Sequence, residues 1–305
     1  MEILKKLLKC LLGKFFMEVS EKQKTTITVP VPQPNLVAPT ILEPAKEKIA
    51  LIYSIEDPAG MLIAEKIKEI GKPDWIEFYE ITKDIVFANL TKVKESKVVF
   101  LSRHQSAVGT KSLTVHMIGN FGEAKFGGKA RTLSGTLPKI GANYLRTLNE
   151  KNTSSGLNKQ GFVVTMEVTH HGPFSNKGCV FIEIGSSPAD WKNPLAAKII
   201  AETIISETFK INSDKVVIGL GGGHYAPDFT KLLLRQKFSF GHICPKHQLE
   251  NLNKELLLNM IEKSGATQII LDWKGLKENK ERIMFLCEKS RMPIERVQTL
   301  LKSDA

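Results

Sequence analysis

The sequence predicts an α/β protein in which helices flank a single sheet that is mainly parallel or mixed. Strand-like apolar runs alternate with amphipathic, helix-like segments from residue 48 to the C-terminus, as in folds where helices cover a parallel sheet. The chain has 305 residues, 42% hydrophobic and 25% charged, which is enough to bury a stable core without disulfides. Its four cysteines are scattered, without a CxxC pair, so a reducing, cytoplasmic compartment fits best.

The alternation begins with KIALIYS (48–54), an apolar run typical of a buried strand. A helix is expected over 57–71, because Asp57 can cap it, Pro58 suits its first turn and Gly71 can end it. The next apolar runs predict strands at 75–81, 97–102 and 113–121, then a helix over 138–152 and strands at 162–170 and 179–185.

The second half continues the pattern with a long amphipathic helix over 186–207. The later elements are expected at 215–220 (strand), 229–236 (helix), 238–243 (strand), 249–265 (helix), 268–273 (strand) and 293–302 (helical). Ligands of parallel sheets bind beyond the carboxyl ends of the strands. Since histidine-bearing turns follow four of the predicted strands, we expect the functional site at that edge.

Residues 1–47 differ from this pattern and are expected to form a separate N-terminal segment before a catalytic domain at 48–305. MEILKKLLKCLLGKFF has an apolar helical face but is too short, and too often interrupted by lysine, to span a bilayer. A surface-lying helix, a docking helix and a start site at Met17 all remain open. Residues 27–45 contain five prolines and are typical of an extended linker.

The chain carries a formal net charge of +11, which favours capture of polyanions such as nucleic acid. A basic surface that is merely solvated is the alternative. Residues 111–146 and 231–246 are rich in Lys and Arg and lie between the histidine-bearing turns. No RNP, KH or zinc-knuckle motif is present, so recognition is expected through phosphate and shape.

Six of the seven histidines fall in four short segments: 102–110, 167–174, 219–228 and 240–248. Histidine titrates near neutrality and is the commonest metal ligand, so this pattern predicts a hydrolase, with metal assistance as one option. The seventh, His116, lies in an apolar stretch, where a satisfied core histidine is the more frequent case. No GxSxG elbow occurs, which disfavours an α/β-hydrolase triad.

Three of these segments suggest specific chemistry. Glu167, beside the pair His170 and His171, can act as a base, a metal ligand or the partner that fixes a histidine tautomer. In GLGGGHYAPD (219–228) the glycines can present backbone amides, and a histidine and an aspartate can face a pocket. HICPKH (242–247) has spacing that can hold zinc but lacks one ligand.

Taken together, SRHQS, LTVHMIGNFGEAKFGG, EVTHHGPFSNKGCVFIEIGSS, GLGGGHYAP and FGHICPKH resemble the D-aminoacyl-tRNA deacylase family of archaea and plants. The resemblance runs from about residue 48 to the C-terminus, and five ordered motifs are much more specific than any one of them. It implies hydrolysis of the carboxylic ester joining a D-amino acid to tRNA, a proofreading step in translation. It also implies zinc dependence and a fold similar to peptidyl-tRNA hydrolase and nucleoside phosphorylase.

The resemblance itself assigns no ligands, so we expect the following roles from the chemistry of the residues in the matched motifs and basic stretches. The metal ligands expected are His104, His170, His171 and His224; the catalytic residues are Glu167, His224 and Asp228; the oxyanion amides are Gly221, Gly222 and Gly223; the tRNA contacts are Arg103, Lys111, Lys125, Lys129 and Arg131. A monomer is favoured. The alternatives are a peptidyl-tRNA hydrolase-like or nucleoside-processing enzyme, or a non-catalytic RNA-binding module.

Overall fold

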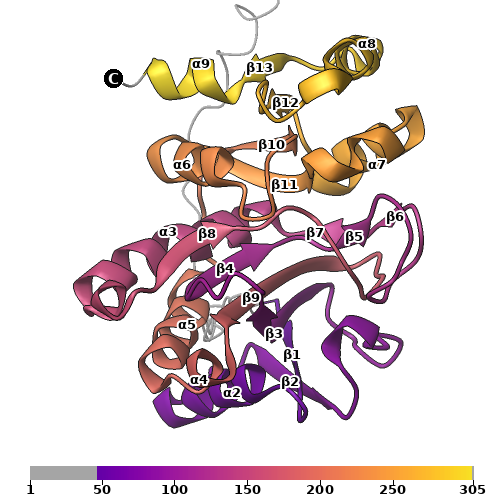
Figure 1. Cartoon of the computed structure of the whole chain (residues 1–305). Helices are drawn as coiled ribbons and strands as arrows, with labels where there is room; N and C mark the ends of the chain where they lie inside the picture. The colour runs from indigo at the N-terminus through magenta and orange to yellow at the C-terminus, as the bar shows by residue number, and fades with distance from the viewer. Residues whose placement is uncertain (1–46, 304–305) are drawn as a thin grey trace, which may run out of the picture. The chain divides into compact units, whose positions relative to one another are not determined.

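The computed structural model describes residues 47–303, whose strands form a main sheet, a smaller parallel sheet and a two-stranded sheet (Figure 1). The predicted α/β class is confirmed, but the strands expected in one sheet are divided among these. An apolar run indicates a strand but does not show which strand it pairs with, because pairing depends on hydrogen bonds between segments that are far apart in the sequence. Residues 1–46, with the expected amphipathic segment and linker, and residues 304–305 lie outside the described residues.

The main sheet has the order β2-β1-β3-β9-β4-β8, with the short β7 beside β9. Neighbours are parallel except β9 and β4, which are antiparallel. The bounds are β1 Ile49–Ser54, β2 Ile76–Ile81, β3 Lys97–Gln105, β4 Ser112–His116, β7 Gly135–Thr136, β8 Val163–Met166 and β9 Gly178–Ser186.

The antiparallel joint corrects the expectation that the histidine turns share one carboxyl edge. Because β4 and β8 run opposite to β3 and β9, the carboxyl ends of β4 and β8 lie at one edge of the sheet and those of β3 and β9 at the other. The register instead aligns Ser102, Glu183 and Thr114 across β3, β9 and β4. Side chains two residues apart share a face, so His104 and His116 lie on the same face as Glu183.

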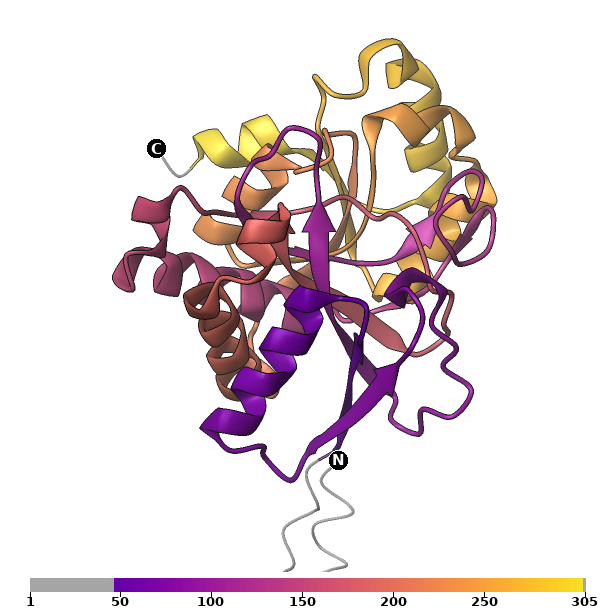
Figure 2. The same ribbon diagram turned by 60° about the horizontal axis from the view of Figure 1, so that its bottom comes forward.

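Helices cover the opposite face of the main sheet. Leu101 and Ile182 of that face belong to the largest apolar core, together with Ile63 of α2 (Pro58–Ile70) and Ile200 of α5 (Pro194–Glu207). Figure 2 shows α2 and α5 side by side there. The histidine-bearing face is covered by loops and by the 3-10 helix η1 (Ile85–Phe87), which join a smaller core cluster.

The smaller sheet has the order β11-β10-β12-β13 and is entirely parallel. Its strands are β10 Lys215–Leu220, β11 Phe238–Cys244, β12 Gln268–Leu271 and β13 Ile294–Arg296. The remaining helices are α3 Pro138–Ser154, α4 Pro188–Trp191, α6 Pro227–Arg235, α7 Lys254–Ser264, α8 Lys280–Ser290 and α9 Val297–Lys302. The 3-10 helices η2 Leu157–Gln160, η3 Lys246–Asn251 and η4 Lys277–Asn279 complete the set, with β5 Gly119–Asn120 paired to β6 Thr132–Leu133.

Several boundaries follow local signals. Asp57 accepts hydrogen bonds from the amides of Ala59 and Gly60 and so caps α2 as predicted. The helix expected over 186–207 is instead two helices, α4 and α5. Asn193 caps α5, and Pro194 can begin a helix but cannot continue one, because it has no N–H to donate.

Residues 167–169 link the two larger sheets. β8 ends at Met166, earlier than predicted. The Glu167 N–H still donates to Val115 O of β4 (3.1 Å), but the two amides that follow find partners in the second half of the chain. Val168 N–H donates to the His224 carbonyl (3.0 Å) and Thr169 N–H to that of Ile243 (3.0 Å). This segment therefore holds the histidine pair against the glycine-rich turn after β10. Within residues 47–303 no helix combines the length and apolarity needed to cross a membrane.

Candidate active site

The buried carboxylate of Glu167 lies among three histidines. Its Oε2 is 2.8 Å from His224 Nε2 and 3.5 Å from His170 Nε2, and its Oε1 is 3.1 Å from His104 Nδ1. Neither oxygen meets the directional requirement of a hydrogen bond. Burial raises the pKa of Glu167, but the neighbouring imidazoles outweigh burial and hold this pKa below its usual value. The geometry thus presents an ionised carboxylate in a buried site.

A second buried carboxylate, Glu183 of β9, lies behind the first. Its Oε2 is 3.6 Å from His104 Nδ1 and accepts a hydrogen bond from Thr114 Oγ1 (3.3 Å), and its Oε1 is 3.7 Å from His116 Nε2. Burial raises the pKa of Glu183, and the two histidines lower it more strongly. The same contacts raise the pKa values of both histidines against the opposing effect of their own burial.

His116, His170 and His171 form a tight group. The ring of His170 lies 4.3 Å from those of His116 and His171, centroid to centroid. Nε2 of His116 is buried and makes no hydrogen bond, so this histidine is not the satisfied core residue expected from its apolar setting. Burial, together with the charge of neighbouring histidines, lowers the pKa of His170 and lowers that of His171 to about 4. These two imidazoles are therefore neutral, which is the form that binds metals.

Three sets of side chains bring potential metal-ligand atoms within 4.8 Å of one another. They are His116, His170 and His171; His104, Glu167 and His224; and His116, Glu167 and Glu183. Imidazole nitrogen and carboxylate oxygen are both zinc ligands. The four histidines expected as ligands are thus brought together, but in two neighbouring sets rather than one.

Close backbone contact positions the histidine pair. A Cβ on Gly172 would lie 2.3 Å from Gly128 N and 2.5 Å from Val86 O, so only glycine fits there. Gly172 N–H donates to Phe126 O (2.9 Å). This packing places the loop that carries Phe126 next to His170 and His171.

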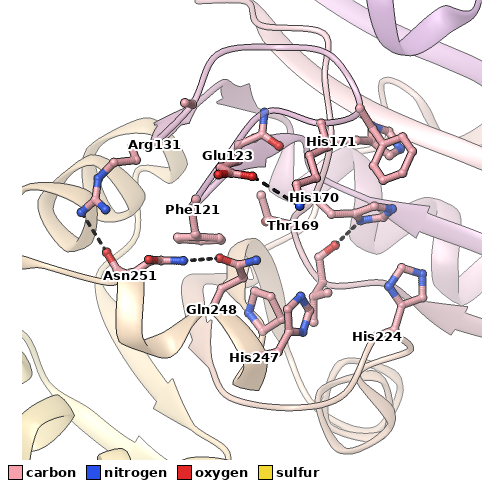
Figure 3. Close-up of a pocket in the computed structure, with 18 residues that line it drawn as sticks. Phe121, Glu123, Arg131, Thr169, His170, His171, His224, His247, Gln248 and Asn251 are labelled. Carbon is pink, nitrogen blue, oxygen red and sulfur yellow. Dashed lines mark hydrogen bonds and ion pairs between the residues drawn. The ribbon is translucent and has the colours of Figure 1, made fainter.

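Two cavities meet at the histidines. The larger, of about 700 Å³, is lined by Lys125 among others, and Figure 3 shows Phe121, Arg131, Gln248 and Asn251 on the side away from His171 and His224. The smaller, of about 560 Å³, is lined by Asp57, Asp84, Arg103, His104 and Glu183 among others. Phe126, His170, His171 and His224 line both. These volumes fall within the range of small-molecule sites.

Comparison with known proteins identifies the family. The model of the D-aminoacyl-tRNA deacylase family matches residues 91–295. The chain belongs to this deacylase family. The resemblance noted in the sequence is confirmed, and with it the predicted class of ester-hydrolysing enzyme.

Named relatives agree with this assignment, and a solved structure shares the fold. D-aminoacyl-tRNA deacylase of Ignicoccus hospitalis is 37% identical over 219 residues, covering 71% of this chain and 85% of the relative. That of Pyrococcus furiosus is 42% identical over 227 residues, covering 73% and 78%. The crystal structure of a conserved protein of unknown function matches with a TM-score of 0.78 and 31% identity, over 84% of this chain and 98% of that one.

In this deacylase family member, two expected catalytic features lie apart from the carboxylate centre. Asp228 is at the start of α6 and contacts Gln298 Nε2 (3.5 Å) and Lys231 Nζ (3.9 Å) instead of the histidines. As the second residue of a helix that begins at Pro227, its carboxylate turns toward α9. Gly221 N–H already donates to Cys244 O (2.9 Å) and is not free for an oxyanion. Gly222 and Gly223 form the turn that leads to His224.

The expected tRNA contacts lie in three places: the loop 122–131, the wall of the smaller cavity, and a site outside both cavities at Lys111. Lys125 and Arg131 line the larger cavity and Arg103 the smaller one. Lys129 lies over the ring of Phe174, 4.3 Å from its centroid. Lys111 pairs with Asp190 (3.7 Å), outside the lining of either cavity. The basic loop 122–131 therefore borders the site, whereas Lys111 does not.

HICPKH does not form a metal site among the described residues. His242 is fully buried, with Nε2 3.0 Å from Ser134 O and Nδ1 3.2 Å from Thr169 Oγ1. Burial raises the pKa of the Cys244 thiol, which keeps it protonated. His247 lies apart from both and lines the larger cavity.

Two residues of this site were not predicted from the sequence. Glu183 had a weak signal, a lone carboxylate within the apolar run CVFIEIG, which a buried strand does not explain. Tyr225 had none: its hydroxyl is 3.0 Å from His104 Nε2, a contact made across 121 residues of sequence.

Proposed function

We propose that this protein hydrolyses the ester that joins a D-amino acid to the 3′-terminal ribose of tRNA, releasing both. The observation that carries the proposal is Glu167, a carboxylate with no exposed surface in contact with three histidines where two cavities meet. The family gives the reaction class, and this centre supplies a base and an electrostatic environment for it. Such an enzyme would act in the cytoplasm, where charged tRNA is used.

His224 is the proposed general base. Its side chain is 42% exposed, and Nε2 contacts Glu167. The charge of a carboxylate 2.8 Å from Nε2 favours the tautomer protonated there and stabilises the imidazolium that forms when a proton is taken up. Nδ1 is then available to remove a proton from attacking water and return it to the ribose oxygen that leaves. An aminoacyl ester is more reactive than an amide, so modest stabilisation of the tetrahedral intermediate suffices.

The residues present also fit a zinc ion. His116, His170 and His171 would hold it, because two of them are neutral and Nε2 of His116 is buried without a hydrogen bond. His104, Glu167 and His224 offer a second set of suitable donors. Zinc lowers the pKa of a bound water toward neutrality and polarises a carbonyl oxygen. The chain itself orients His224 through Glu167 and encloses the reacting ester between the two cavities.

The test is release of amino acid from D-tyrosyl-tRNA and L-tyrosyl-tRNA by metal-stripped protein, with and without added zinc. We expect turnover of the D-ester that zinc restores and little turnover of the L-ester. D-selective turnover that does not depend on zinc would support the deacylase function and show that the metal takes no part in it. Absence of turnover in both conditions would overturn the proposal and favour an RNA-binding module without catalysis.

A further inference from the structure

We infer that the two cavities divide the substrate: the larger one holds the 3′-terminal adenosine of tRNA, and the smaller one holds the D-aminoacyl group. This inference rests on the proposed function and assigns an orientation to its substrate. An aminoacyl ester has a nucleoside on one side of the reacting carbonyl and an amino acid on the other. Two cavities that share His170, His171 and His224 as a common wall match this arrangement.

Charge determines which cavity takes which part. The larger cavity is lined by the cations Lys125 and Arg131, with Glu123 as its acidic side chain. The smaller is lined by three carboxylates, those of Asp57, Asp84 and Glu183, and by one permanent cation, Arg103, which pairs with Asp84 (3.5 Å). The terminal nucleoside brings a phosphate, whereas the aminoacyl group brings an α-ammonium. Opposite charges attract in both cavities only when adenosine lies in the larger one.

A pair of side-chain amides in the larger cavity fits a purine base. Asn251 Nδ2 donates to Gln248 Oε1 (2.7 Å). This bond leaves Asn251 Oδ1 as an acceptor and Gln248 Nε2 as a donor, and neither has a protein partner among the described residues. Adenine presents the complementary set, the N6 amino donor beside a ring-nitrogen acceptor.

The surroundings hold this amide pair in place. Arg131 donates to the Asn251 carbonyl (3.2 Å), and a Cβ at Gly122 would lie 2.9 Å from Asn251 Nδ2 and 3.0 Å from Gln248 Oε1. Figure 3 shows Asn251 and Gln248 at one end of the cavity, with Phe121 beside them and His170, His171 and His224 toward the other end. Side-chain amides held in place are groups that proteins use to read the edge of an unstacked base. The base would lie at the amide end and the ester at the histidine end.

The experiment combines residue changes with a change of the terminal base. Steady-state release of D-tyrosine is measured for wild-type protein and for Asn251→Leu, Gln248→Leu and Asp84→Asn, on tRNA ending in adenosine and on tRNA ending in cytidine. Affinity for uncharged tRNA of both kinds is measured by fluorescence. Asn149→Leu, an exposed asparagine of α3 outside both cavities, is the matched control. Circular dichroism confirms that each variant is folded.

We expect terminal cytidine to raise KM about ten-fold for wild type and to have little further effect on Asn251→Leu or Gln248→Leu. Both variants should also bind uncharged tRNA more weakly. Asp84→Asn should raise KM for D-tyrosyl-tRNA and leave the affinity for uncharged tRNA within two-fold. Equal sensitivity to the terminal base in all variants, or the opposite pattern for Asp84→Asn, would overturn the assignment while turnover by wild type persists. No turnover by wild type would overturn the proposed function itself.

Discussion

Oε2 of Glu167 lies 2.8 Å from Nε2 of His224, which joins a carboxylate with no exposed surface to an imidazole that is 42% exposed. Burial alone would favour the protonated acid, because a charge without partners is costly in a protein interior. The surrounding histidines reverse this preference and keep Glu167 ionised. The contact therefore connects a fixed buried charge to the proposed proton carrier at the cavity wall.

Replacing Glu167 with glutamine keeps the volume of the side chain and removes its charge. We expect kcat for D-tyrosyl-tRNA to fall about 10²- to 10⁴-fold, the range for loss of acid–base assistance, with affinity for uncharged tRNA unchanged. Single-turnover release of D-tyrosine measures this. Glu65→Gln, on the exposed side of α2, is the matched control and should behave as wild type. Activity within ten-fold of wild type would contradict a central role for Glu167.

Replacing His224 with alanine should abolish turnover and leave tRNA affinity nearly intact, because the imidazole acts on the ester rather than on the tRNA body. His247→Ala is the comparison: His247 lines the larger cavity but is not among the histidines in contact with Glu167. It should raise KM more than it lowers kcat. If His224→Ala loses tRNA binding as well as turnover, its role is structural.

Zinc should stabilise the folded protein through the group His116, His170 and His171. A ligand at 100 times its Kd adds about 2.7 kcal/mol to the free energy of unfolding, so the Tm of stripped protein should rise by roughly 5–10 °C. Differential scanning fluorimetry with added zinc measures the shift. Magnesium, which prefers oxygen ligands, is the control ion. A full zinc shift in His116→Ala would show that the ion binds elsewhere.

Removing charge from the basic loop should weaken tRNA binding and reduce its dependence on salt. Each phosphate contact contributes about 0.7–0.9 to the slope of log affinity against log salt. The double variant Lys125→Gln, Lys129→Gln should therefore lower the slope by roughly 1–2. Lys280→Gln, Lys289→Gln in α8 makes the same change of net charge away from both cavities. Equal slopes for the two double variants would mean that the basic loop makes no specific contribution.

His242 should make stability depend on pH below neutrality. Its burial lowers its pKa from 6.5 to about 4, so the unfolded chain binds the proton more readily than the folded one between these values. The contribution of neutral His242 to the free energy of unfolding is complete above about pH 6.5. It is lost as the pH falls toward 4, which lowers the free energy of unfolding by up to about 3 kcal/mol. Unfolding in urea at about pH 7 and about pH 4.5 measures it. His242→Gln should lose less stability across this range than wild type; an equal loss would assign the dependence to other groups.

Most secondary-structure elements and the family could be predicted from the sequence alone. Apolar runs located most strands, and local signals that act within a few residues, such as Asp57 before Pro58, located helix starts. Five ordered motifs identified the family, and they drew attention to Glu167 and to the four histidines expected as metal ligands. These are properties of short segments, and the sequence displays short segments directly.

How these segments contact one another became visible only in the folded protein. The antiparallel pairing of β4 with β9 moved the site from a sheet edge to a sheet face and placed His116 beside Glu183. The same packing carried Asp228 away from the centre and joined His104 to Tyr225 across 121 residues. Strand partners are chosen by long-range hydrogen bonding and burial. Those depend on every other segment being in place, so no local pattern in the sequence records them.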